Sequence, residues 1–178
     1  MNKAVFLDRD GTLNVDAGYT YKTGDLRFFP DVFKSLKLLL NDFKFFIITN
    51  QSGIGRGYYT KEDFQKFNDL LVSALENEGI MIEKTYCCPH RPEDGCDCRK
   101  PNKKFIDDAK NEFDIDLSKS FVIGDHPCDV EMGQRAGCKS IHLLTGHGQK
   151  HKSEVKADFV AKDLYEAAGW ILNAKDRI

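Results

Sequence analysis

The sequence predicts an α/β fold in which a doubly wound, mainly parallel sheet is covered by helices. Short apolar runs rich in β-branched and aromatic residues alternate with segments whose apolar residues have helical spacing. Polar residues suited to chemistry follow three of these runs directly, as expected where ligands gather at the carboxyl ends of parallel strands. The length of 178 residues suits a single domain that spans residues 1–178, with one core and no large accessory domain.

Five strands are predicted from the apolar runs, each of a length typical of a buried strand. They cover residues 4–7, 43–49, 80–86, 121–123 and 140–144. Crossovers between parallel strands are normally right-handed and place helices on both faces of the sheet. We therefore expect the sheet to be buried between two layers of helices.

Helices are predicted between the strands and after the last of them. They cover residues 32–40, 61–78, 103–113, 130–136 and 164–174. Asp31 is a candidate N-cap for the first helix, and Thr60 with Asp63 resembles an acidic capping box for the second. The polar residues 145–156 are predicted to form a mobile loop before the last elements.

Composition and charge exclude several classes of protein. Hydrophobic residues make up 41% of the chain and charged residues 30%, which is ordinary for a globular protein and unlike a disordered one. The formal charge of -2 comes from interspersed acids and bases, so we expect a small-molecule partner and no nucleic acid. No segment is apolar enough for a signal peptide or a membrane span, so we expect no membrane partner and a cytoplasmic location. We also expect a monomer.

Three aspartates follow predicted strands: Asp8 and Asp10 come after the first strand and Asp125 after the fourth. Carboxylates brought together at one sheet edge repel one another unless a cation neutralises them. Mg²⁺ prefers oxygen ligands and commonly bridges carboxylates to a phosphate. One acid can then attack phosphorus while its neighbour transfers a proton, because Gly11 and Thr12 let the backbone turn. A β-turn with solvated acids is the alternative for this segment.

Further residues in the same context favour catalysis. Thr49 and Asn50 end the second predicted strand and offer a hydroxyl and an amide to phosphoryl oxygens, although such residues also cap helices and turns. Lys100 would supply a positive charge, whereas a single lysine is usually a surface residue. Asp129, shortly after Asp125, is either a fourth acid of the site or a helix N-cap.

With these motifs the chain resembles the haloacid dehalogenase-like (HAD) phosphatase superfamily. The resemblance covers nearly the whole chain and rests on Asp-Arg-Asp-Gly-Thr at residues 8–12, the strand ending in Thr49, Lys100, and Gly-Asp…Asp at residues 124–129. It implies a Rossmann-like core without a separate cap domain. It also implies a hydrolase that removes phosphate from a small phosphorylated metabolite.

The resemblance assigns a role to each of these residues. Asp8 is expected to be the nucleophile that forms an aspartyl-phosphate, and Asp10 the general acid and base. Thr49 and Lys100 are expected to hold the transferring phosphoryl group. Mg²⁺ would be bound by Asp8, Asp125 and the backbone carbonyl of Asp10.

Residues 86–101 form a cysteine loop that is predicted to hold a structural zinc ion. The candidate ligands are Cys88, His90, Cys96 and Cys98. Three thiolates and one imidazole complete a tetrahedral shell with no open position for water, which favours a structural over a catalytic metal. Reduced surface cysteines or a redox pair are the alternatives. The remaining cysteines are expected to pack or to point away from this set: Cys87, Cys128 and Cys138.

The position of the cysteine loop links it to the phosphate site. Arg99 and Lys100 follow the last cysteine directly, so a bound metal would also fix two cations beside the phosphate. Arginine suits a bidentate grip on a second anionic group, whereas a lysine acts as a point charge.

The cysteine loop resembles that of two groups within the superfamily, the heptose bisphosphate phosphatases and the histidinol-phosphate phosphatases. Residues 14–19 and 49–57 are more similar to the heptose group, which implies removal of the 7-phosphate of D-glycero-D-manno-heptose 1,7-bisphosphate. By this resemblance the substrate contacts are Asp16, Ala17, Gly18, Tyr19, Asn50, Gln51, Ser52, Arg99 and His126.

Two departures keep histidinol phosphate as the alternative substrate. His126 stands where the heptose enzymes usually have a lysine, and a histidine is only partly charged at neutral pH. The short interval between the two halves of the cysteine loop is also more similar to the histidinol-phosphate group. A zinc-stabilised, non-catalytic binding module is a third hypothesis, which the charge and the complete set of acids disfavour.

Overall fold

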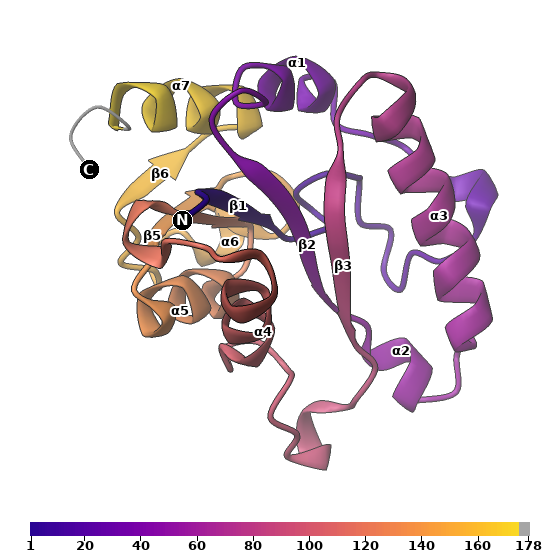
Figure 1. Ribbon diagram of the computed structural model, residues 1–178. Helices are drawn as coiled ribbons and strands as arrows, with labels where there is room; N and C mark the ends of the chain where they lie inside the picture. The colour runs from indigo at the N-terminus through magenta and orange to yellow at the C-terminus, as the bar shows by residue number, and fades with distance from the viewer. Residues whose placement is uncertain (175–178) are drawn as a thin grey trace.

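The computed structural model describes residues 1–174, and its strands form one six-stranded, fully parallel sheet (Figure 1). The strands are β1 (Ala4–Leu7), β2 (Lys44–Asn50), β3 (Ile82–Cys88), β4 (Phe121–Gly124), β5 (Lys139–Leu143) and β6 (Phe159–Ala161). Their order across the sheet is β3-β2-β1-β4-β5-β6. The predicted doubly wound parallel fold is therefore confirmed.

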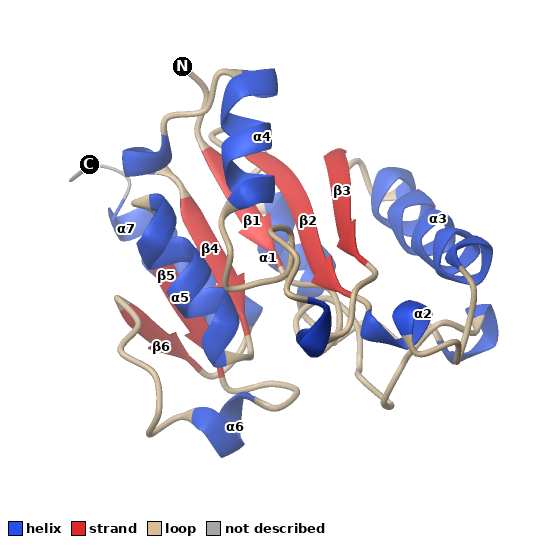
Figure 2. Ribbon diagram, turned by 90° about the horizontal axis from the view of Figure 1, so that it is seen from below, coloured by secondary structure: helices blue, strands red, loops and turns tan. Residues whose placement is uncertain are grey.

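Helices cover both faces of this sheet. They are α1 (Val32–Lys37), α2 (Ser52–Gly55), α3 (Lys61–Asn77), α4 (Lys104–Phe113), α5 (Pro127–Ala136), α6 (Gly148–His151) and α7 (Leu164–Ala174). Side chains of α1, α3 and α7 pack into the core on one face, and those of α4 and α5 into the core on the other. Figure 2 shows α4 and α5 in front of the strands.

The alternation of side chains along β1 explains why there are two cores. Val5 and Leu7 belong to the core under α1, α3 and α7, whereas Ala4 and Phe6 belong to the core under α4 and α5. Successive side chains of a strand point to opposite faces, so a strand buried on both sides must be apolar throughout. Each large side chain buried in this way contributes about 1.5–3 kcal/mol of hydrophobic free energy.

Several predicted boundaries differ from the observed ones. β3 ends at Cys88, two residues later than predicted, α1 ends at Lys37, and α5 begins at Pro127. Asp31 occupies the N-cap position of α1, as predicted, but its side chain makes no capping hydrogen bond. The capping box of α3 is confirmed, because Thr60 and Asp63 exchange side-chain and backbone hydrogen bonds.

The predicted loop at residues 145–156 needs the largest correction. It contains the short helix α6, and the chain then adds the sixth strand, β6, which the sequence pattern did not indicate. Thr145 Oγ1 also donates to the backbone carbonyl of Gly11, 2.7 Å away, which joins this segment to the turn after β1. Among the helices of residues 1–174, none has both the length and the apolar character needed to cross a membrane.

Candidate active site

A pocket of about 310 Å³ lies at the carboxyl ends of the central strands. β1 is the point where the strand order reverses, since it pairs with β2 on one side and β4 on the other. Ligands of doubly wound sheets bind at such a point. The pocket is lined by Asp8, Asp10, Asp16, Gly18, Tyr19, Thr49, Asn50, Gln51, Ser52, Tyr59, Arg99, Lys100, Asp125, His126, Cys128, Asp129 and His147.

A buried lysine lies between two carboxylates at the floor of the pocket. The Nζ of Lys100 is 2.7 Å from an oxygen of Asp8 and 2.7 Å from an oxygen of Asp129. It also donates to the backbone carbonyl of Ile48, 2.8 Å away. Burial alone would lower the pKa of Lys100, but the charges of Asp129 and Asp8 outweigh that effect and raise it. This lysine therefore stays protonated and can hold an anionic group.

Asp125 follows β4 and completes a cluster of three carboxylates. Asp8, Asp125 and Asp129 each offer an oxygen within 4.8 Å of the other two. Burial and the charge of Asp8 raise the pKa of Asp125 to about 7. Burial likewise raises the pKa of Asp8 to about 7, although Lys100 acts in the opposite direction. The cluster has too much negative charge for its single lysine to balance.

The residues present fit a divalent cation. Three carboxylates opposite one lysine leave two uncompensated charges, and carboxylate oxygens are preferred ligands of Mg²⁺. Two glycines also leave room for Asp125, because a Cβ on Gly11 or Gly146 would lie 2.2 or 2.1 Å from its Oδ2 atom. The backbone N–H of His147 donates to the same oxygen at 2.7 Å, which orients the carboxylate. The sequence did not indicate this contribution of residues 146–147.

Asp10 is held by side chains from three different positions. Arg9 donates to both of its carboxylate oxygens at 2.8–3.2 Å, and Asn14 Nδ2 donates to Oδ1 at 2.9 Å. Gln51 Nε2 donates to Oδ2 at 2.8 Å. Sequence reasoning missed the roles of Arg9 and Asn14, although Asn14 lies four residues from Asp10, close enough for a local hydrogen bond.

Gln51 connects Asp10 to the end of β2. Its Nε2 atom also donates to Thr49 Oγ1 at 2.8 Å, and its Oε1 atom accepts from the hydroxyl of Tyr59 at 2.5 Å. Thr49 and Gln51 are both buried. The predicted phosphate ligand Thr49 and the predicted proton donor Asp10 are therefore joined through one amide, which Tyr59 orients. Tyr59 is a further residue that the sequence did not indicate.

The loop at residues 16–20 forms one wall of the pocket. Asp16 Oδ1 accepts from the backbone N–H of Gly18 at 2.7 Å, and Asp16 Oδ2 lies 3.1 Å from His147 Nε2. Tyr19 has a left-handed backbone with φ of 53° and contacts Tyr58 edge to face. Ala17 lies outside the lining of the pocket.

The remaining predicted substrate contacts also lie around the pocket. Arg99 Nη1 donates to the backbone carbonyl of His90 at 3.2 Å, so the cysteine loop orients this arginine. Ser52 begins α2 at the pocket edge. His126 Nδ1 accepts from the backbone N–H of Cys128, and its ring lies 4.8 Å from that of His151. Desolvation and the neighbouring histidine lower the pKa of His126 to about 4, so it is neutral at pH 7.

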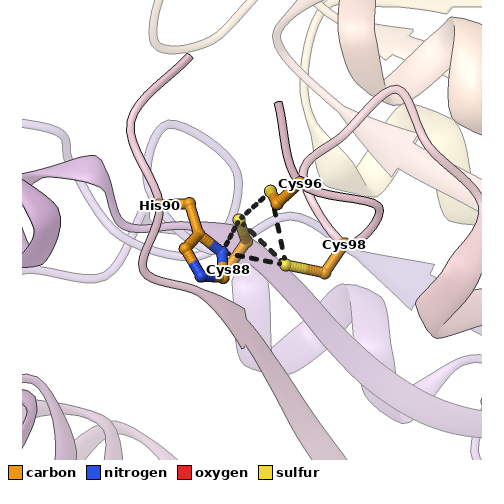
Figure 3. Close-up of side chains that lie close together, drawn as sticks. All are labelled: Cys88, His90, Cys96 and Cys98. Atoms are coloured by element: carbon orange, nitrogen blue, oxygen red, sulfur yellow. Dashed lines mark hydrogen bonds between the residues drawn. The ribbon is translucent and has the colours of Figure 1, made fainter. Parts of the chain in front are cut away.

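Figure 3 shows the four predicted ligands of the cysteine loop pointing toward one another. The Sγ–Sγ and Sγ–Nδ1 separations are 3.3 Å for Cys88–Cys98 and His90–Cys98, 3.6 Å for Cys88–Cys96 and Cys96–Cys98, and 3.7 Å for Cys88–His90. Three sulfurs and one nitrogen at zinc bond lengths form a tetrahedron with edges of about 3.5–3.8 Å, close to these separations. The set is therefore able to hold a zinc ion, and the structure records no disulfide among these free cysteines.

The other cysteines lie outside that set. Cys138 is buried in the core under α4 and α5, as predicted. Cys87 is on the strand beside Cys88 and lines a separate groove against α3. Cys128 lines the active-site pocket, where burial raises the pKa of its thiol and keeps it protonated.

Comparison with known proteins places the chain in a family. A family model described as HAD-hydrolase-like matches residues 97–167. A probable D-glycero-D-manno-heptose-1,7-bisphosphate 7-phosphatase of Thermoplasma acidophilum is 46% identical over 75% of this chain and 83% of its own length. A D-glycero-beta-D-manno-heptose-1,7-bisphosphate 7-phosphatase of Helicobacter pylori J99 is 41% identical over 96% of this chain and 97% of its own. The chain belongs to this family of HAD-like phosphatases.

A solved structure extends the agreement within this phosphatase family to three dimensions. The D,D-heptose 1,7-bisphosphate phosphatase of B. bronchiseptica, complexed with magnesium and phosphate, superimposes with a TM-score of 0.88. It is 30% identical in sequence, and the match covers 96% of this chain and 98% of that one. The resemblance to HAD phosphatases inferred from the sequence is thereby confirmed.

Proposed function

We propose that the protein removes the 7-phosphate from D-glycero-D-manno-heptose 1,7-bisphosphate by way of an aspartyl-phosphate on Asp8, and that it requires Mg²⁺. The observation that carries the proposal is the buried cluster of Asp8, Asp125 and Asp129 around Lys100, at the switch point of the sheet. The names of the family relatives support the choice of substrate.

The reaction begins with Asp8. An oxygen of its carboxylate attacks the 7-phosphorus, and the bond from phosphorus to the sugar oxygen breaks as Asp10 gives a proton to that oxygen. Lys100 and the hydroxyl of Thr49 bind the phosphoryl oxygens during transfer. Asp10, now deprotonated, takes a proton from water, which attacks phosphorus and releases inorganic phosphate from Asp8.

The residues that would hold the metals follow from the two clusters. Mg²⁺ would be bound by Asp8, Asp125 and the backbone carbonyl of Asp10, with Asp129 close to this set. When bound, Mg²⁺ neutralises charge between the carboxylates and the incoming phosphate. A structural Zn²⁺ would be bound by the four residues of the cysteine loop, where it stabilises the segment that carries Arg99 and Lys100.

The rim of the pocket gives the proposed sugar contacts. Asp16, Gly18 and Tyr19 would face the heptose from one wall, and Ser52 and Gln51 from another. Arg99 would pair with the second phosphate, because it lies in the pocket wall and its guanidinium suits a bidentate grip on phosphate oxygens. His126 is neutral and would contribute a hydrogen bond there and no charge.

A substrate panel with a nucleophile variant tests the proposal. Phosphate release from heptose 1,7-bisphosphate is compared with release from histidinol phosphate at matched concentrations with Mg²⁺, and NMR identifies which phosphate is lost. We expect the heptose bisphosphate to be preferred and its 7-phosphate to be removed. Asp8→Asn keeps the shape of the side chain but removes the attacking charge, so it should lose turnover by about 10³-fold or more while remaining folded.

The matched control is Asp107→Asn, the same chemical change on the surface of α4, where Asp107 pairs with Lys103. Its turnover should equal that of the wild type. A preference for histidinol phosphate would replace the substrate in this proposal. Full activity of Asp8→Asn would refute covalent catalysis by Asp8, and binding of oligonucleotides without hydrolysis of any phosphoester would favour a binding module.

A further inference from the structure

We propose that Asn50 is a positioning residue that holds the catalytic lysine in place, instead of the substrate ligand that the sequence resemblance implies. The inference deepens the proposed function and rests on the role of Lys100 in it. Asn50 Oδ1 accepts from the backbone N–H of Lys100 at 3.1 Å. Asn50 Nδ2 donates to the backbone carbonyl of Lys100 at 3.3 Å. The amide thus uses both of its polar atoms on the backbone of a single residue.

Lys100 depends on such a contact because its own segment has no regular structure. It lies near the end of the cysteine loop, before α4, outside every helix and strand. Yet it is only 4% exposed, and its Nζ must be within hydrogen-bond distance of Asp8, Asp129 and the Ile48 carbonyl at once. A buried ammonium that loses its partners is costly, and a shift of the backbone would remove all three together.

Asn50 is well placed to fix that backbone. It is the last residue of β2 and directly follows Thr49, the other proposed phosphate ligand. Its position is set by pairing with Cys88 on β3. Asn50 therefore fixes the two proposed phosphate ligands, Thr49 and Lys100, relative to each other. It is bonded to Thr49 along the chain, and its side chain is hydrogen-bonded to the backbone of Lys100.

The cysteine loop provides a second anchor for the same segment. Cys98 lies two residues before Lys100, and Asn102 Nδ2 donates to the carbonyl of Cys96 at 2.9 Å. These contacts tie the segment to the sheet through Cys88, the last residue of β3, whereas Asn50 ties it to β2. Asn50 is the nearer anchor to Asp8, because Asp8 follows β1 and β1 pairs directly with β2.

Two substrates distinguish positioning from direct contact with the sugar. Asn50→Ala is compared with the wild type on heptose 1,7-bisphosphate and on p-nitrophenyl phosphate, which has no sugar. A residue that acts through Lys100 affects every phosphomonoester, so we expect kcat to fall by a similar factor, about 10²-fold, on both substrates with a smaller change in KM. Bound zinc, measured by metal analysis, should stay stoichiometric.

Controls keep the test decisive. Asn111→Ala makes the same change at an exposed position of α4 and should match the wild type. Asn50→Asp keeps the acceptor for the Lys100 N–H but puts a carboxylate oxygen against the Lys100 carbonyl, so it should lose turnover on both substrates at least as much as Asn50→Ala. If Asn50→Ala does not fold, Asn50→Asp is compared with the wild type in its place.

The outcomes separate this inference from the substrate assignment. Loss confined to the heptose substrate, with p-nitrophenyl phosphate turnover unchanged, would overturn the positioning role. If the wild type hydrolyses only p-nitrophenyl phosphate, the substrate proposal fails and the comparison of Asn50 variants still stands. If it hydrolyses neither, calorimetric binding of inorganic phosphate with Mg²⁺ replaces the rate: weaker binding by Asn50→Ala supports the inference, and equal binding refutes it.

Discussion

At the scale of single residues, Arg9 is notable because it places a charged side chain in the interior beside the site. Its side chain is fully buried, and its guanidinium carbon lies 5.2 and 4.7 Å from the ring centres of Phe64 and Phe67. A buried guanidinium is tolerated only when paired, and Arg9 pairs with Asp10 and with the carbonyl of Thr20. The aromatic faces add cation–π attraction in a desolvated setting. Arg9 therefore stabilises the fold and orients the proposed acid and base together.

Replacing Arg9 should consequently affect stability and rate at the same time. Arg9→Met keeps much of the apolar stem but removes the charge and the three hydrogen bonds to Asp10. We expect the free energy of unfolding to fall by about 3 kcal/mol, as measured by urea denaturation, and kcat to fall as well. The control Arg135→Met breaks only an exposed pair with Glu131 and should change stability by less than about 1 kcal/mol. Equal effects of the two substitutions would contradict this role of Arg9.

The residue scale also shows where sequence reasoning is strong and where it fails. The acids after β1 and β4 could be predicted to meet, because parallel strands present their carboxyl ends at one edge. The burial of Arg9 could not be predicted, since it depends on contacts with α3, a helix far along the chain. The two-atom contact of Asn50 with Lys100 was equally hidden, because it joins residues fifty positions apart.

At the scale of elements, the cysteine loop organises one side of the pocket. Its backbone is joined to α2 and the end of β2, where Gln51 N–H donates to the Cys88 carbonyl and Gly55 N–H to the Pro89 carbonyl. Gly55 permits this approach, because a Cβ there would lie 2.8 Å from the Pro89 oxygen. A metal ion bound in the cysteine loop would thus stabilise both the segment that contains Arg99 and the part of the pocket wall that contains Ser52.

Removing two of the proposed zinc ligands should therefore reduce both metal content and activity. In the double variant Cys96→Ser with Cys98→Ser, we expect zinc to be lost, the melting temperature to fall, and kcat to decrease because Lys100 loses one anchor. Metal analysis and calorimetry measure these changes. Cys87→Ser, which alters a neighbouring cysteine outside the cluster, should retain zinc. Stoichiometric zinc in the double variant would contradict the assignment.

Elements with weak patterns were the ones that sequence reasoning missed. β6 is only three residues long and is not fully buried, so its pattern lacks the long apolar run that marked the other strands. α6 spans four residues, less than the length at which helical periodicity can be detected. Tertiary contacts define both: β6 pairs with β5, and the segment before α6 contacts Asp125 and Gly11.

At the scale of the whole molecule, the fold concentrates negative charge that its own side chains do not balance. The doubly wound sheet brings Asp8, Asp125 and Asp129 to one switch point, where burial raises the pKa of all three. Their ordinary pKa lies near 4. Without a metal, the folded protein therefore keeps protons on this cluster at pH values where the unfolded chain has lost them.

This difference fixes the sign of a pH effect. Between pH 4 and about 7 the folded state binds protons that the unfolded state does not, so the free energy of unfolding contributed by these groups falls as pH rises. Mg²⁺ binds the deprotonated carboxylates and competes with those protons. Its affinity should accordingly rise with pH over the same interval.

We therefore expect Mg²⁺ to stabilise the protein more at pH 8 than at pH 5, with the stabilisation rising through the acid range and levelling off above about pH 7, the pKa of Asp125. Melting temperatures with and without Mg²⁺ across this range measure the effect. Other titrating groups affect both curves alike and cancel in the difference. Asp125→Asn removes one titrating ligand, so it should weaken the stabilisation by Mg²⁺ and flatten its pH dependence. If the stabilisation by Mg²⁺ were the same at pH 5 and pH 8, the carboxylate cluster would not be its binding site, because protons would then not compete with the metal.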